Sequence, residues 1–100
     1  MILITLPDLA VEDRLLADAR NGSHEARHQI FDLYYEPLYQ YIRLRVEDAL
    51  QAEDMASDVF VKLLDSLRTR RAPRQSLRGW LFRVARNAIY DHYGKRKRLM

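Results

Sequence analysis

The chain has 100 residues, 48% of them apolar, which is the size and composition of a single domain built around one packed core. It contains no cysteine, which excludes disulfides and thiolate metal sites and fits the reducing environment of the cytoplasm. The net charge of +3 hides an asymmetry that indicates nucleic acid: residues 68–98 carry eleven Lys or Arg and one acid, whereas residues 1–67 carry six bases and thirteen acids.

The first residues of the chain are apolar but short. Residues 1–6 lack a basic n-region and are followed by Pro7 and Asp8, so we expect neither a signal peptide nor a membrane span. A helix is then predicted over residues 9–21, with Asp8 as its N-cap and Gly22 as the left-handed residue that ends it. We expect residues 1–8 to be an extension, residues 9–94 to form the domain, and the protein to be cytoplasmic with no membrane partner.

The second predicted helix begins after Ser23, which is expected to cap it. Pro37 lacks a backbone donor, so we expect a kink or a split into two segments at this point. The apolar spacing predicts that this helix buries Ile30, Phe31, Leu33, Tyr34, Leu38, Tyr41, Ile42 and Val46.

The third predicted helix is the most clearly two-sided. Asp48 and Gln51 resemble a capping box that opens a helix reaching about Leu67. Its predicted core side comprises Ala52, Met55, Ala56, Val59, Phe60, Leu63 and Leu67. Its predicted outer side comprises Glu53, Asp54, Ser57, Asp58 and Asp65.

A basic loop follows over residues 68–75, and Ser76 is expected to cap the last helix. The apolar stripe of that helix comprises Leu77, Trp80, Leu81, Val84, Ala85, Ala88 and Ile89. Gly94 is expected to end it, which leaves residues 95–100 as a basic tail or the start of a linker. Helical spacing recurs along nearly the whole chain, so the predicted fold is all-α, a small bundle of four to five helices.

Residues 24–28 read His-Glu-Ala-Arg-His, the pattern in which two histidines one turn apart hold zinc and the Glu activates water. The expected cap at Ser23 places both histidines on an exposed first turn, and no third histidine follows at the metzincin spacing. His92 or Glu47 could complete a site only by coincidence. We therefore predict no metal, no cofactor and no enzymatic activity.

Arginines and aromatic residues alternate near the last helix, as in surfaces that follow phosphates and stack on unpaired bases. Arg78, Arg83 and Arg86 supply charge, and Trp80, Tyr90 and Tyr93 supply aromatic surface. Two plainer interpretations stay open here. Trp80 lies on the apolar stripe and could be a core residue, and the arginines could form a solvated basic face, although one acid among eleven bases leaves them few local partners.

Two sequence blocks resemble a known family. The first, at residues 52–60, reads Ala-Glu-Asp-Met-Ala-Ser-Asp-Val-Phe, and the second, at residues 80–87, reads Trp-Leu-Phe-Arg-Val-Ala-Arg-Asn and is followed by Asp91. With the Gly22-Ser23 turn and the helix around residues 33–41, they resemble region 2 of bacterial sigma factors of the extracytoplasmic-function group. The resemblance covers about residues 9–97.

The resemblance implies a helical domain that binds the clamp coiled coil of the RNA polymerase β′ subunit and captures the melted −10 promoter strand, the non-template strand. It implies a polymerase-binding face at Glu53, Asp54, Ser57 and Asp58. Combined with the charge pattern, it gives as DNA-binding candidates Arg70, Arg71, Arg74, Arg78, Trp80, Arg83, Arg86, Asn87, Tyr90 and Lys95. It also implies an anti-sigma factor as a further partner and no small-molecule substrate.

The chain departs from the family pattern in several places. Ser57 stands where the family usually has Gln, Leu64 where it often has Trp, and Arg70 and Arg71 where the loop has an aromatic residue. The family's second domain, a helix-turn-helix that reads the −35 element, has no counterpart in these residues, as expected for a fragment or a shortened relative. The alternative function is therefore a protein-interaction module that binds polymerase or an anti-sigma factor without opening promoters.

For individual residues the plainer interpretations also stay open. Asp54 and Asp58 could belong to a solvated helix face near an N-terminus, which favours anions in any case. Asn87 and Asp91 could be structural, with Asp91 paired to Lys95 one turn later.

Overall fold

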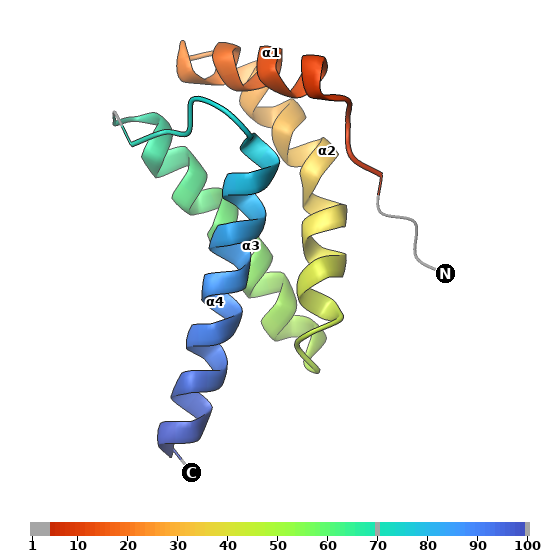
Figure 1. Cartoon of the computed structure of the whole chain (residues 1–100), viewed down its shortest axis with the longest axis vertical. Helices are drawn as coiled ribbons and strands as arrows, with labels where there is room; N and C mark the ends of the chain where they lie inside the picture. Colours follow the sequence, from red (N-terminus) through yellow and green to blue (C-terminus); the bar gives the residue numbers. More distant parts are fainter. Residues whose placement is uncertain (1–4, 70, 100) are drawn as a thin grey trace.

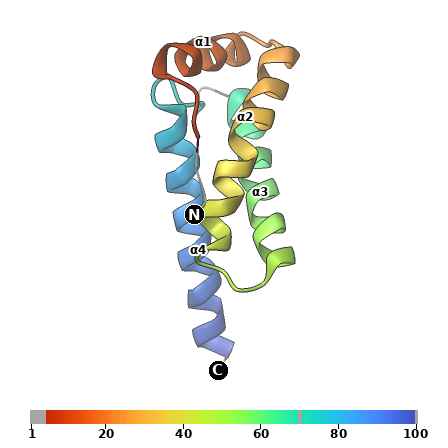
Figure 2. The ribbon, with the colours of Figure 1, turned by 90° about the vertical axis from the view of Figure 1, so that its right-hand side faces the viewer.

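The structure, a computed structural model, describes residues 5–69 and 71–99, the last four of these by their backbone alone. Within these ranges the chain forms four helices and no strand: α1 (Leu9–Arg20), α2 (His24–Arg43), α3 (Ala49–Leu67) and α4 (Leu77–Leu99). Helices α2, α3 and α4 run along the long axis of the molecule, and α1 lies across one end of them (Figures 1 and 2). The all-α prediction is confirmed.

The helices begin where their capping residues predict. The side chains of Asp8 and Ser23 accept the backbone N–H three residues ahead, at 2.9 and 3.1 Å. Asp48 accepts from the N–H groups of Leu50 and Gln51, at 2.9 and 3.5 Å. Gly22 has a φ of +96°, the left-handed conformation expected after α1. These contacts satisfy N–H groups that the first turn of a helix leaves without partners.

Two predicted boundaries are wrong. Helix α2 continues through Pro37 as one element of 20 residues. Ile30, Tyr34, Leu38 and Ile42 are buried on both sides of the proline, so packing along one axis outweighs the single hydrogen bond that it removes. Gly94 does not end α4, which reaches Leu99. Glycine inside a helix costs only about 1 kcal/mol relative to alanine, and the Lys and Arg residues that follow favour helix.

The core lies between the four helices. Every side chain predicted for the core side of α3 is buried, and every one predicted for its outer side is exposed. In α2 two core predictions are wrong, because Phe31 and Leu33 are each 41% exposed. The inward stripe of α2 follows Ile30 at steps of four, and Phe31 and Leu33 lie off that stripe. In α4 the deeply buried side chains are Leu77, Leu81, Ala85 and Ile89, with Trp80, Val84 and Ala88 partly buried beside them.

Candidate nucleic-acid interface

One exposed face of α4 carries four of the ten predicted DNA-binding residues. Because Leu77, Leu81, Ala85 and Ile89 turn inward, the residues on the opposite side of the helix face solvent. These exposed residues are Gly79, Arg83, Arg86, Asn87 and Tyr90, which recur at helical spacing. We call this face, together with the described loop residues 68–69 and 71–76, the DNA-side surface.

The DNA-side surface contains two adjoining hollows at the start of α4. The larger, about 440 Å³, is lined by residues that include Arg71, Trp80 and Arg83. The second, about 310 Å³, lies toward α2 and is lined by residues that include Tyr41, Phe82 and Arg86. Gly79 and Arg83 border both hollows. Positive charge and aromatic surface therefore meet in an open recess, as required for binding a phosphate and an unpaired base together.

Trp80 combines the two roles that the sequence left open. It packs against the core from α4, yet it is only partly buried and borders the larger hollow. Such an amphipathic ring can serve the core with one edge and a ligand with the other. Gly79 allows the Oγ of the capping residue Ser76 to approach closely, since a Cβ at this position would lie 2.6 Å from that oxygen.

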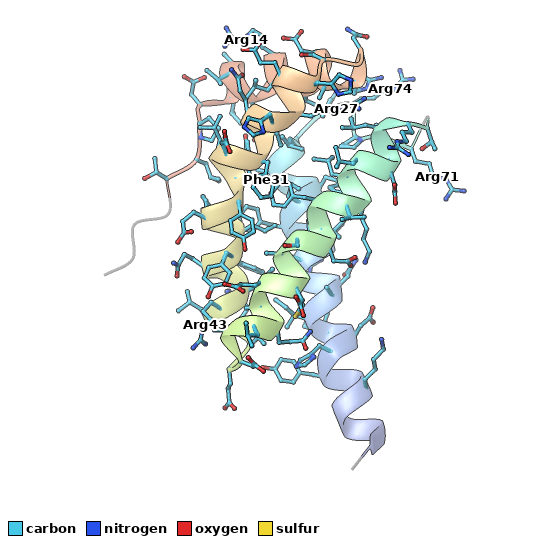
Figure 3. The ribbon with its side chains drawn as sticks, turned by 180° about the vertical axis from the view of Figure 1, so that it is seen from behind. Arg14, Arg27, Phe31, Arg43, Arg71 and Arg74 are labelled. Carbon is cyan, nitrogen blue, oxygen red and sulfur yellow. The ribbon has the colours of Figure 1, made fainter. Side chains whose placement is uncertain are left out.

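Other predicted DNA-binding residues lie outside the two hollows. Arg74 borders two recesses beside α1. Figure 3, seen from behind, shows its side chain near that end of the molecule. Tyr90, 66% exposed, lies further along α4, and Lys95 is exposed on its last turns. Arg70 lies outside the described residues. The structure thus brings together Arg71, Trp80, Arg83 and Arg86, and separates Arg74 and Lys95 from them.

Arg78 has a different environment from the other arginines. Its Nε donates a hydrogen bond to Oε1 of Glu12 at 2.8 Å, and its Nη2 donates to the backbone carbonyl of Pro7. The bond to Glu12 raises the pKa of the Arg78 guanidinium above its usual value. The Arg78 side chain, 30% exposed, is therefore held by hydrogen bonds to α1 and the segment before it. Glu12 was missed by sequence reasoning, although its spacing from Leu15, Leu16 and Ala19 on one helix face was a signal that it points inward.

The acidic face of α3 lies apart from the DNA-side surface. Glu53, Asp54, Ser57 and Asp58 are all exposed on it. Asp58 pairs with Lys62 one turn later, at 3.2 Å between Oδ2 and Nζ. Both partners are more than half exposed, so this pair contributes little to stability and leaves the carboxylate free to exchange partners.

A row of aromatic side chains on α2 adjoins this acidic face. Phe31 stacks on Tyr35 at 5.1 Å between ring centroids, and Tyr35 stacks on Tyr39 at 6.1 Å. Figure 3 shows Phe31 between α2 and α3. Its ring packs edge to face with that of Phe60, at 5.1 Å between ring centroids. Burial and then the charge of Glu53 raise the pKa of Tyr35, so this ring lies beside the acidic face. Sequence reasoning placed Phe31 in the core and missed this row.

The zinc-like motif occupies an ordinary helix start. His24, Glu25 and His28 are exposed in the first turns of α2, and His28 lies 3.4 Å from the carboxylate of Asp32. Among the described residues no group of three His, Cys, Asp or Glu side chains is placed to hold a metal ion. Nor does any helix in the described ranges combine the length and apolar character needed to cross a membrane.

Comparisons with known proteins agree with this architecture. Residues 30–99 match the family model for Sigma-70 region 2. The chain is 32% identical over 79 residues to the ECF RNA polymerase sigma factor BldN of Streptomyces coelicolor, an alignment that covers 79% of this chain and 30% of BldN. It is also 32% identical over 68 residues to the ECF RNA polymerase sigma factor SigX of Bacillus subtilis, covering 68% of this chain and 34% of SigX.

The chain thus spans about a third of the length of these two relatives. No solved structure matches it significantly. The family match covers α3, α4 and most of α2, which carry the acidic face and the DNA-side surface. The chain therefore belongs to the Sigma-70 region 2 family, as a region 2 domain of the extracytoplasmic-function group.

Proposed function

We propose that the chain is the promoter-recognition module of a sigma factor, which takes part in starting transcription and performs no catalysis itself. The acidic face of α3 binds the coiled coil of the β′ clamp, and the DNA-side surface holds the melted non-template strand of the −10 element. The observation that carries this proposal is the open hollow in which Arg71, Trp80 and Arg83 meet at the start of α4. Such a role belongs in the cytoplasm, where the chromosome is.

The chemistry of the hollow suits a single strand better than a duplex. An aromatic face can stack on a base only when that base is unpaired, and each stacked base contributes about 1–3 kcal/mol. Arg71, Arg83 and Arg86 supply charge for the neighbouring phosphates without reading sequence. Trp80 borders the same hollow as Arg71 and Arg83, so it would stack on a base that melting has already exposed.

The acidic face of α3 and the aromatic row beside it support the same role. The exposed carboxylates of α3 favour a basic partner, and the aromatic row of Phe31, Tyr35 and Tyr39 offers it apolar contact area. Ser57 provides only a short hydroxyl where the family usually has a long amide. We infer that the aromatic row supplies part of the polymerase contact that this amide would otherwise make.

One observation favours the second candidate function, a protein-interaction module that binds polymerase or an anti-sigma factor without opening promoters. Phe31 and Leu64, on α2 and α3, are 41% and 42% exposed and line one apolar recess together with Phe60, and contiguous exposed apolar surface marks protein-binding sites. This second function would need the α2–α3 surface but not the hollow beside Trp80.

The salt dependence of strand binding distinguishes the two functions. With polymerase core present, the log-log slope of affinity against salt for a single-stranded −10 oligonucleotide should fall by about 0.7 for each phosphate that an arginine no longer neutralises. We expect that decrease for Arg71→Ala, Arg83→Ala and Arg86→Ala, each measured by fluorescence anisotropy. Arg14→Ala, on the exposed side of α1 (Figure 3), removes the same charge elsewhere and should leave the slope unchanged. Equal slopes for all four variants would favour the interaction module.

A further inference from the structure

A buried polar cluster connects the N-terminal part of the chain to the start of α4. The Glu12 side chain is fully buried, and its Oε1 accepts hydrogen bonds from Arg78 at 2.8 Å and from the Tyr34 hydroxyl at 2.6 Å. Arg78 also donates to the carbonyl of Pro7. We call Glu12, Tyr34 and Arg78 the Glu12 cluster, which joins α1, α2 and α4.

Stability alone is a weak reason for such a cluster. Burying the Glu12 carboxylate costs desolvation energy, which its bond to the 30% exposed Arg78 side chain largely offsets, and apolar residues of similar volume often serve equally well at such sites. The other oxygen of Glu12, Oε2, is buried without a hydrogen-bond partner, so the cluster is not optimised for stability. Burial and then the bond to Glu12 raise the pKa of Tyr34, which keeps its hydroxyl protonated as a donor. The cluster therefore fixes the positions of α1, α2 and the start of α4 relative to one another.

Arg78, which Glu12 holds in place, lies next to the DNA-side surface. Arg78 is the second residue of α4, and Gly79 and Trp80 follow it directly. Ser76, just before the helix, has a φ of +55°. Its Oγ accepts from the Gly79 N–H at 3.2 Å, and its carbonyl accepts from the Trp80 N–H at 3.1 Å. The bonds of Arg78 act at this junction beside Leu77, which is buried in the core, and they tie the start of α4 to α1 and Pro7. The larger hollow spans this junction, with Arg71 before it and Trp80 and Arg83 after it.

We propose that Glu12 is a positioning residue for nucleic-acid binding. Its hydrogen bond to Arg78 fixes the position at which the loop enters α4, and this in turn aligns Arg71 with Trp80 and Arg83. This inference rests on the proposed function of the DNA-side surface. It also gives α1, which lies outside the family match, a part in DNA binding without any contact to DNA.

For Glu12→Gln, the proposal and simple electrostatics predict opposite changes in nucleic-acid affinity. Glu12→Gln removes a negative charge close to the DNA-side surface and releases Arg78. Charge alone would then make nucleic acid bind more tightly, because one more arginine could reach a phosphate. Loss of alignment would make it bind more weakly. The sign of the change therefore distinguishes positioning from charge.

The experiment measures binding of a fluorescent single-stranded −10 oligonucleotide to polymerase core with the whole chain, at a temperature where every variant is folded. We expect Glu12→Gln to bind about tenfold more weakly, since an ångström of misplacement can cost more than that. Val59→Ala is the matched control, because Val59 is fully buried on α3 and absent from the cluster. It should lower the melting temperature but leave oligonucleotide affinity unchanged.

A second variant makes the test independent of how well Glu12→Gln folds. The double variant Glu12→Gln/Arg78→Gln removes both charges together, so it leaves no unpaired buried charge. We expect it to bind as weakly as Glu12→Gln, with the salt dependence of the unaltered chain. A slope lower by about 0.7 would mean that Arg78 itself contacts a phosphate, and would overturn the proposal.

The outcomes separate this inference from the proposed function. If the unaltered chain with polymerase does not bind the oligonucleotide, the proposed function is wrong and the inference fails with it. If the unaltered chain binds and Glu12→Gln binds equally or more tightly, only the inference is wrong. A parallel decrease of affinity in Val59→Ala would also overturn it, because general destabilisation would then explain the effect.

Discussion

Trp80 is the residue at which the packing of the domain and its proposed function meet most directly. Its ring contacts the core on one side and borders the larger hollow on the other. Its neighbour Leu81 is fully buried and borders neither of the two hollows. These adjacent residues allow the contribution to folding to be separated from the contribution to strand binding.

We predict that Trp80→Ala impairs promoter opening more than it impairs polymerase binding. Because the ring is only partly buried, the loss of stability should be roughly 2 kcal/mol, below the roughly 3–5 kcal/mol of a fully buried aromatic. Leu81→Ala should cost about 2–5 kcal/mol and leave opening by the folded fraction unchanged. Permanganate footprinting and thermal melts measure the two effects. The prediction fails if Trp80→Ala opens promoters normally while costing as much stability as Leu81→Ala.

At the scale of elements, α3 shows how far local pattern determines structure. Apolar residues recur along α3 at a regular helical spacing, so the sequence predicts both its buried and its exposed face correctly. The failures elsewhere depend on packing that no local pattern contains. The continuity of α2 through Pro37 depends on core contacts at both of its ends. The charge pattern located the candidate site, but it could not show that Arg78 is bonded to Glu12, because the two residues are 66 positions apart in the chain.

The outer face of α3 provides the prediction at this scale. Reversing Asp54 and Asp58 to Lys should abolish binding to the β′ coiled coil, because the face would then repel a basic partner. The melting temperature should change little, since both side chains are exposed and the Asp58–Lys62 pair is weak.

The matched control for this variant is Asp13→Lys with Asp18→Lys, which makes the same charge change on the exposed side of α1. A pull-down with polymerase core should retain the control and lose the α3 variant. Undiminished binding of the α3 variant would show that the acidic face is not the polymerase contact.

At the scale of the whole molecule, the domain keeps opposite charges on different helices. The acidic face belongs to α3, and the DNA-side surface belongs to α4 and the loop before it, with the core between the two helices (Figure 1). Helix α1 lies across the end at which that loop enters α4. In the proposed function, a protein partner and a nucleic-acid strand would thus contact different helices of one bundle and could be bound together.

The central claim, that the DNA-side surface captures a melted strand, is tested most directly by comparing single-stranded with duplex −10 DNA. The measurement is the affinity of each for polymerase core with the whole chain at one salt concentration. Stacking of even one unpaired base contributes about 1–3 kcal/mol, so we predict a preference for the non-template single strand of at least about fivefold. Trp80→Ala should reduce that preference. Equal affinity for the single strand and the duplex would contradict the claim.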